Sequence, residues 1–234
     1  EKKGIQVYNT PTASSRSVAE LAFAHIMGLY RFLPLSNRKM PHDGQTEFKS
    51  MKKAFSKGQE VQGKRLGIVG LGRIGKELAN IALGAGIDVI AHDPWTEDNS
   101  IQIKIASQIL QVHVPLVDME EILTKCDIIS IHVPRADQPI ISTNELDKLK
   151  DGVILVNTAR GGCIEEETIL QGLKSGKIGG VALDVFNNEP TPDGRLLNHD
   201  RISVTPHIGA STTQAQDKIA QVIVDLIDKA FKAQ

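Results

Sequence analysis

Short apolar runs alternate with amphipathic segments from about residue 65 to residue 204. Such runs are typical of strands buried on both faces of a parallel sheet. The intervening segments carry apolar residues at helical spacing. Strands are expected near residues 65–69, 87–91, 128–132, 153–156, 179–183 and 202–204. Helices are expected near residues 73–84, 118–125, 143–149 and 165–174. The alternation predicts an α/β fold with a doubly wound parallel (Rossmann) sheet.

The N-terminal part of the chain shows a strand signal followed by a helix signal. Residues 4–9 are expected to form a short strand. A helix over residues 17–33 is expected to open with a capping box made by Ser17 and Glu20. Pro34 is expected to stop this helix, because proline removes a backbone donor and clashes with the preceding turn.

Three further segments have a less regular pattern. Residues 34–62 are polar and rich in lysine, which predicts a long irregular connection, a type of segment that often binds a partner. Residues 94–117 are ambiguous, and we expect a helix and a short strand there. A last helix over 212–232 has an apolar stripe that must be buried against another surface.

The run from Gly67 to Asp93 combines a strand, a Gly-x-Gly-x-x-Gly turn, a helix, a second strand and a terminal aspartate. Gly70 permits the tight turn, Gly72 lets the backbone approach a pyrophosphate, and Gly75 lets helix and strand pack closely. The helix N-terminus offers N–H groups to phosphates. A tight glycine turn without a ligand is the alternative, but the complete pattern favours a dinucleotide.

Asp93 indicates which dinucleotide binds. It ends the second strand, where a carboxylate can accept hydrogen bonds from both ribose hydroxyls. A negative charge at this point repels a 2′-phosphate, so the sequence predicts NAD rather than NADP as the cofactor.

Composition excludes several other classes of function. The chain has 27 basic and 28 acidic residues and no basic stripe, which argues against nucleic-acid binding. Cys126 and Cys163 lie far apart in apolar contexts, so we expect buried free thiols and a cytoplasmic location. No apolar run is long enough to span a membrane, and no residue grouping has the spacing of a metal site.

Candidate catalytic residues follow three successive strands. Arg160 lies in Asn-Thr-Ala-Arg-Gly, Glu189 in Asn-Glu-Pro, and His207 in Pro-His-Ile-Gly. In a doubly wound fold, the loops after the strands form one crevice, so these side chains can converge. Taken alone, an arginine such as Arg160 is more often a surface residue, a glutamate such as Glu189 lies more often in a solvated turn, and a histidine such as His207 is more often not catalytic.

Together these motifs resemble the NAD-dependent D-2-hydroxyacid dehydrogenases over essentially the whole chain. The resemblance implies that Arg160 holds the substrate carboxylate and that Glu189 and His207 form an acid–base pair. It also implies that Asp184 contacts the nicotinamide carboxamide. The formate dehydrogenases of the same superfamily carry Gln where Glu189 stands, so Glu189 favours a 2-hydroxy acid over formate.

The chemistry suits these residue types. A histidine can accept and return a hydroxyl proton near neutral pH, and a guanidinium can grip a carboxylate through two hydrogen bonds. The cofactor contacts that the motifs and the resemblance imply are made by Gly70, Gly72, Arg73, Ile74, Gly75, Asp93, His132, Val133, Pro134, Thr158, Ala159, Asp184, His207 and Gly209.

The resemblance also implies a domain organisation. Because the chain begins at Glu1 without Met, we expect a piece in which most of a flavodoxin-like substrate domain is missing. Residues 1–12 would be its remnant, 13–211 the NAD-binding domain, and 212–234 a helix returning to it. Homodimerisation is expected through helix 17–33 and the arm 34–62.

The substrate follows from a weaker signal. Residues 209–216, Gly-Ala-Ser-Thr-Thr-Gln-Ala-Gln, are similar to the branch of the family that oxidises 3-phosphoglycerate in serine synthesis. A small 2-hydroxy or 2-oxo acid, with 3-phosphoglycerate first, is therefore the expected substrate. The alternative is an NAD-sensing module without turnover, like the corepressors on this fold.

Overall fold

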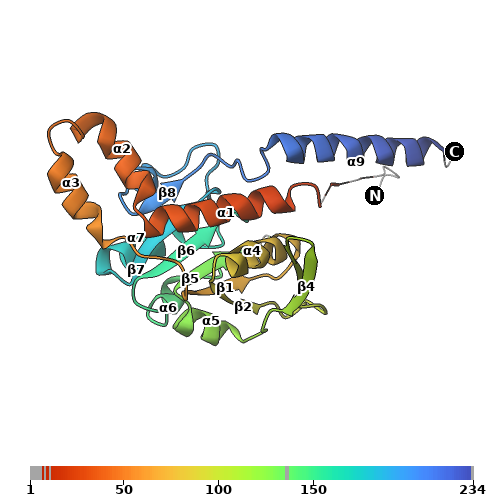
Figure 1. The fold of residues 1–234 in the computed structure, drawn as a ribbon, viewed down its shortest axis with the longest axis horizontal. Coiled ribbons are helices and arrows are strands. Elements are labelled where there is room, and N and C mark those ends of the chain that lie inside the picture. The colour runs from red at the N-terminus through yellow and green to blue at the C-terminus, as the bar shows by residue number, and fades with distance from the viewer. Residues whose placement is uncertain (1–6, 8, 11, 135–136, 233–234) are drawn as a thin grey trace.

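Six parallel strands form the central sheet of the computed structural model, which describes residues 7, 9, 10, 12–134 and 137–232 (Figure 1). Their order across the sheet is β2-β1-β5-β6-β7-β8. The strand bounds are β1 Arg65–Val69, β2 Asp88–His92, β5 Ile128–Ile131, β6 Val153–Asn157, β7 Ile178–Leu183 and β8 Ile202–Val204. The doubly wound sheet predicted from the sequence is confirmed. Its strand order reverses between β1 and β5, which places a crevice at their carboxyl ends.

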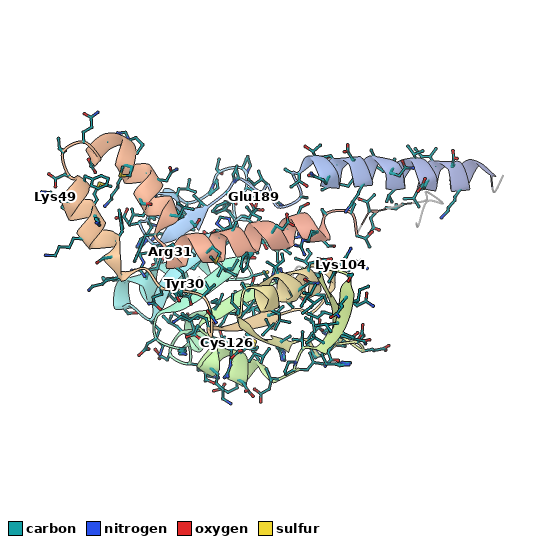
Figure 2. All side chains as sticks on the ribbon, viewed as in Figure 1. Tyr30, Arg31, Lys49, Lys104, Cys126 and Glu189 are labelled. Atoms are coloured by element: carbon teal, nitrogen blue, oxygen red, sulfur yellow. The ribbon has the colours of Figure 1, made fainter. Side chains whose placement is uncertain are left out.

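Helices cover both faces of this sheet. On one face α1 (Ser15–Tyr30) and α4 (Arg73–Gly84) pack over β1, β6 and β7. The other face is covered by α5 (Met119–Lys125) and α7 (Glu166–Ser175). Two short helices, α6 (Thr143–Leu146) and α8 (Gly194–Leu197), complete this layer. The two layers bury two separate apolar clusters against the sheet, and Cys126 lies within the second of them (Figure 2).

The first helix begins earlier than predicted, and the expected capping box is wrong. Ser14 is the N-cap and makes no side-chain cap bond, whereas Ser17 lies inside the helix. The Ser17 hydroxyl is 2.8 Å from that of Thr212, which ties α1 to the segment before the last helix. The helix ends at Tyr30, and Pro34 falls in the first turn of the next helix, where proline is tolerated.

The expected irregular connection over residues 34–62 is also wrong. It contains α2 (Leu33–Asp43), α3 (Phe48–Ala54) and the 3₁₀ turn Phe55–Lys57. These helices stand away from the sheet at one end of the molecule (Figure 1). Met51 is their only buried side chain among the described residues, so they lack the apolar stripe by which a helix is recognised in sequence.

No single helix among the described residues is long and apolar enough to cross a membrane. By length and composition alone, α1 and α2 together would pass such a test, but a 61° bend separates them. The strand expected over residues 4–9 falls mainly outside the described residues.

A β-hairpin replaces the helix expected within residues 94–117. Strand β3 (Ser100–Ile105) pairs antiparallel with β4 (Gln108–His113) in a separate two-stranded sheet. Isoleucines at 101, 103 and 105 alternate with polar residues, which is the period of a strand. Ile101 is buried in the core, whereas Lys104 lies at the outer end of the hairpin (Figure 2). The segment therefore contains strand structure as expected, but as two paired strands. Leu116 adds an isolated parallel bridge to Ala91.

The last helix, α9 (Thr213–Lys232), lies where predicted but extends away from the sheet (Figure 1). Its stripe is not buried within this chain, since Ile223 and Ile227 are exposed.

Candidate active site

The glycine turn joins β1 to the N-terminus of α4. Gly70 has a φ of +96°, a conformation that favours glycine, and a Cβ there would lie 2.9 Å from the carbonyl of His132. A Cβ on Gly75 would collide with the carbonyl oxygen of Gly70, so the helix can approach the strand only with glycine at this position. A Cβ on Gly72 would meet no atom within 4 Å. The backbone at Gly72 therefore borders open space, in front of the free N–H groups of the helix.

That open space belongs to a cleft of 660 Å³ at the carboxyl ends of the strands. Predicted site residues line this cleft from the glycine turn and from the loop after β5: Gly72, Arg73, Ile74, His132, Val133 and Pro134. Others line it from the loops after β6, β7 and β8: Thr158, Ala159, Arg160, Asp184, His207 and Gly209. Gly70, Gly75, Asp93 and Glu189 do not line the cleft. Glu189 is bonded to His207, which does line it, whereas Gly70, Gly75 and Asp93 shape the turn beside it.

Five residues at the cleft wall were not predicted from the sequence. They are Asn9, Ser14, Ser15, Val18 and Ala210. The start of α1 brings most of them to the cleft. The usable signal was the Gly-Ile-x-Val-x-Asn-Thr-Pro motif at residues 4–11, which contains Asn9 but carries no recognisable chemistry on its own.

Asp93 is anchored beside the glycine turn. Its Oδ2 accepts a hydrogen bond from the backbone N–H of Leu71 at 2.8 Å, and its Oδ1 accepts one from the N–H of Trp95 at 2.9 Å. A carboxylate offers about four acceptor positions, so further positions remain for hydroxyl donors. The geometry thus fixes a negative charge next to the dinucleotide turn.

Three buried polar atoms at the cleft have no hydrogen-bond partner among the described residues: Ser15 Oγ, His132 Nδ1 and Thr158 Oγ1. Buried polar groups are nearly always paired in folded proteins. Burial lowers the pKa of His132 to about 4, so its ring is neutral near pH 7, and its Nε2 is 2.8 Å from Ser130 Oγ. A ligand rich in hydroxyl, amide and phosphate oxygens would supply the missing partners, and a dinucleotide is such a ligand.

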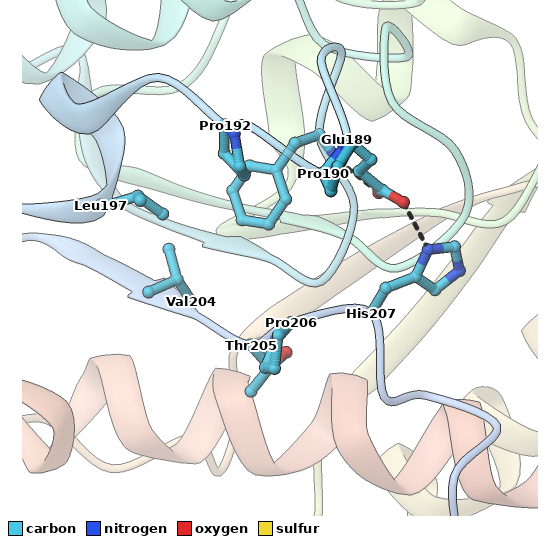
Figure 3. Close-up of a pocket in the computed structure, with 9 residues that line it drawn as sticks. Glu189, Pro190, Pro192, Leu197, Val204, Thr205, Pro206 and His207 are labelled. Atoms are coloured by element: carbon cyan, nitrogen blue, oxygen red, sulfur yellow. Dashed lines mark hydrogen bonds and ion pairs between the residues drawn. The ribbon is translucent and has the colours of Figure 1, made fainter.

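Glu189 and His207 form a hydrogen-bonded pair at the end of the cleft (Figure 3). His207 Nδ1 is 2.8 Å from Glu189 Oε2, and Glu189 Oε1 accepts a bond from the N–H of Phe186 at 2.9 Å. The bond to His207 holds the pKa of Glu189 below its usual value, and the positive charge of Arg160 acts in the same direction. An ionised Glu189 assigns the proton to Nδ1, which leaves Nε2 of the neutral ring as a proton acceptor.

His207 also borders a second, apolar pocket of 450 Å³. Phe186 and Leu197 form part of its wall. Figure 3 shows Pro190, Pro192 and Val204 on the same wall. The imidazole therefore stands where the dinucleotide cleft meets a pocket of different chemistry.

Asp184 holds the turn that follows β8. Its buried carboxylate accepts bonds from the N–H groups of Ile208 and Gly209, both at 2.8 Å, and from the hydroxyl of Thr205 at 2.6 Å. His207 precedes those two amides and has a φ of +55°, an uncommon conformation for a residue with a side chain. The carboxylate thereby fixes the backbone that carries His207.

Arg160 lies exposed on the loop after β6. The side chain of Asn157 holds this loop, because its Oδ1 accepts a bond from Ala159 N–H and its Nδ2 donates to the carbonyl of Arg160. The guanidinium donates from Nη1 to the carbonyl of Ala159 at 2.6 Å. Its other N–H groups have no hydrogen-bond partner among the described residues and can bind an anion.

A parallel sheet with this turn, cleft and anchored aspartate defines a Rossmann-type dinucleotide-binding domain. The family model for "D-isomer specific 2-hydroxyacid dehydrogenase, NAD binding domain" matches residues 23–209. The chain belongs to this family and carries its NAD-binding domain.

Relatives and solved structures agree with this placement. A hydroxypyruvate reductase of Thermotoga maritima is 39% identical and aligns with 99% of this chain and 71% of its own length. A D-3-phosphoglycerate dehydrogenase of Archaeoglobus fulgidus is 37% identical over 98% of this chain but only 42% of its own length. The crystal structure of a glyoxylate reductase from Paecilomyes thermophila superposes with a TM-score of 0.83 at 30% identity, covering 98% of this chain and 66% of the other.

Proposed function

We propose that the intact protein transfers a hydride between NAD and a D-2-hydroxy acid. The observation that carries this proposal is the 2.8 Å contact between His207 and Glu189 at the end of the dinucleotide cleft. A histidine oriented by a carboxylate is suited to accept a hydroxyl proton and return it. Family membership supports the same reaction class.

Each site residue has a defined task in this reaction. NAD, when bound, supplies the hydride acceptor. His207 Nε2 takes the proton from the substrate hydroxyl as the carbon loses its hydride, and Glu189 stabilises the imidazolium that forms. Arg160 grips the substrate carboxylate and fixes the hydroxyl-bearing carbon near His207. When NAD is bound, Asp93 and the N-terminus of α4 would hold the ribose and the pyrophosphate, and Asp184 would hold the carboxamide end.

We infer 3-phosphoglycerate as the substrate of first choice. The similarity of residues 209–216 to the phosphoglycerate-oxidising branch supports it, as do relatives named D-3-phosphoglycerate dehydrogenase. A second candidate is hydroxypyruvate. The reductase from Thermotoga maritima aligns over a larger share of its length, and the pocket beside His207 is lined mainly by apolar groups.

The test is turnover by the intact protein. NADH formation with 3-phosphoglycerate is compared with NADH consumption by hydroxypyruvate, glyoxylate and pyruvate under the same conditions. We expect turnover with at least one substrate and no comparable rate with formate. Tight NADH binding without turnover of any substrate would favour the NAD-sensing module and overturn the enzyme.

The uncovered surfaces support two proposals about assembly. We infer that residues 1–12 and 212–234 belong with a substrate domain, because the apolar stripe of α9 is exposed in this chain. We also infer homodimerisation through helix 17–33 and the arm 34–62, where Leu33 and Phe48 are exposed. Sedimentation of the intact protein with Leu33→Asp or Phe48→Asp tests the second inference, and an unchanged dimer would contradict it.

Two free buried thiols, Cys126 and Cys163, support a reducing cytoplasm as the location.

A further inference from the structure

A buried histidine on α1 lies behind the candidate site without touching the cleft. His25 is 6% exposed, and its two ring nitrogens both have hydroxyl partners from the end of β8. Nδ1 is 2.7 Å from Ser203 Oγ, and Nε2 is 3.1 Å from Thr205 Oγ1. No step of the proposed reaction uses His25.

The direction of these hydrogen bonds follows from the number of available protons. The Asp184 carboxylate can only accept, so Thr205 gives its single hydroxyl proton to Asp184 Oδ1 at 2.6 Å. The Thr205 oxygen must then accept from His25 Nε2–H. Burial lowers the pKa of His25, against the opposing effect of Asp184, so the ring near pH 7 carries one proton. That proton is on Nε2, and Nδ1 accepts from the Ser203 hydroxyl.

The chain of bonds ends on the turn that carries the candidate base. Asp184 is 1% exposed, and its Oδ1 accepts a bond from Ile208 N–H and its Oδ2 one from Gly209 N–H. Those amides follow His207, whose positive φ needs support from its surroundings. No cation is bonded to this carboxylate among the described residues, so the donors from Thr205 and the two amides stabilise its charge.

We propose that His25 is a positioning residue of the candidate active site, which acts through Thr205 and Asp184 to hold the 207–209 turn and so the placement of His207 against Glu189. The part that concerns catalytic rate rests on the proposed function. The part that concerns the turn does not. Because α1 also lies beside α4 over the sheet, the same residue links the helix layer to the catalytic loop.

Two substitutions separate the ring nitrogens of His25. The amide of glutamine reaches the position of Nε2 and can still donate to Thr205. The shorter amide of asparagine reaches the position of Nδ1 and can meet only Ser203. If His25 served packing alone, the effects of the two substitutions would follow their effects on the stability of the fold. The proposal instead expects two variants of equal stability to differ in the order of the 207–209 turn.

The first readout is amide hydrogen exchange in the chain itself. His25→Asn is expected to speed exchange of the Ile208 and Gly209 amides about threefold to tenfold, as for the loss of one supporting hydrogen bond. His25→Gln is expected to leave them near the native rate. Amides of β6 serve as an internal control and should not change in either variant. Equal behaviour of the two variants at residues 208 and 209 would overturn the proposal.

A double-mutant cycle tests the route through Thr205. In a Thr205→Val background, His25→Asn should cause no further increase in exchange at Ile208 and Gly209. An undiminished effect would show that His25 acts by another route.

In the intact enzyme, His25→Asn should lower kcat about threefold to tenfold with little change in KM, and His25→Gln should restore it. If the unsubstituted protein turns over no substrate, the proposed function fails while the exchange data still decide on His25.

A measurement without any substitution guards against a variant that fails to fold. The ¹⁵N chemical shifts of a histidine ring distinguish its tautomers. The network requires His25 to be protonated at Nε2 and not at Nδ1 near pH 7. Protonation at Nδ1 would reverse the direction of the chain and overturn the proposal.

Discussion

The two sides of the cleft are built by different means. On the cofactor side, one strand-turn-helix unit supplies glycines and backbone N–H groups, and Asp93 adds a negative charge anchored by the backbone. On the catalytic side, polar side chains from α1 and from the loops after β6, β7 and β8 hold one another through hydrogen bonds. The cofactor side is thus built from one continuous segment of the chain, in which side chains are excluded at the glycine positions that pack closely. The catalytic side depends on contacts between residues far apart in sequence.

The largest effect should come from His207, the proton acceptor of the proposed reaction. His207→Ala in the intact enzyme is expected to lower kcat ~10²–10⁴-fold, because proton transfer loses its acceptor. NADH affinity should change little. His113→Ala, on the exposed end of β4, is the matched control and should have no effect. A near-native rate for His207→Ala would remove His207 from the mechanism.

On the cofactor side, Asp93 should have the next largest effect. Asp93→Ala should weaken NADH binding about tenfold to a hundredfold through the loss of charged hydrogen bonds, and should narrow the preference over NADPH. Asp93→Asn keeps an acceptor for Leu71 N–H but removes the charge, so it separates anchoring of the turn from recognition of the ribose. Dissociation constants for NADH and NADPH from fluorescence titration give the answer. Tighter binding of NADPH by the unsubstituted chain would contradict the role assigned to Asp93.

The close packing of α4 on the cofactor side should also affect stability. Gly75→Ala should lower the free energy of unfolding by about 1–3 kcal/mol, because the new Cβ collides with the Gly70 carbonyl oxygen. Gly84→Ala lies in the same helix, where a Cβ would meet no atom within 4 Å. It should instead stabilise the chain by about 0.5–1 kcal/mol. Urea unfolding of the two variants provides the comparison, and equal shifts would show that close helix packing is not what requires Gly75.

Gly72 should separate folding from binding. Its φ of −73° and the open space around it accept an alanine. The Gly72→Ala variant should therefore unfold at the same urea concentration as the unsubstituted chain. The new methyl group would project into the cleft and should weaken NADH binding about tenfold, equivalent to ~1.4 kcal/mol. The measurement is a paired titration and unfolding experiment. Unchanged NADH affinity would mean that the pyrophosphate of the cofactor does not approach this glycine.

The same contrast explains what could be predicted from the sequence. The bounds of α4 and β8 match the expected ranges, because local apolar periodicity decides them. The sequence predicts a helix and a short strand where the structure has the hairpin at 100–113, although Ile101, Ile103 and Ile105 alternate with polar residues. α2 and α3 were missed because helices with almost no buried side chains leave no stripe.

Long-range polar contacts were the least predictable part of the site. Family motifs pointed to His207 and Glu189, and the structure brings the two side chains into contact. No local pattern marks His25 as a partner of Thr205, because the two residues meet only when α1 packs over the end of β8. The three unpaired polar atoms at the cofactor cleft could likewise be identified only in the folded chain.

The smallest predicted effect is the pH dependence of the Glu189–His207 pair. The hydrogen bond from His207 holds the pKa of Glu189 below its ordinary value of 4.5 in the folded chain. A lowered folded-state pKa gives a stabilisation that is complete above the ordinary value and is lost as the pH falls through the lowered one. Both side chains are partly exposed, so the contribution should stay below about 1 kcal/mol.

Glu189→Gln removes the titrating group and tests this sign. Between about pH 5 and pH 3, the unsubstituted chain should lose slightly more stability than the variant, as measured by urea unfolding at each pH. Glu97→Gln, which removes an exposed carboxylate on the cofactor side, is the matched control and should leave the pH dependence as it is. A steeper loss in Glu189→Gln than in the unsubstituted chain would reverse the sign. It would show that the pair is held by the loops around it and not by the charge on Glu189.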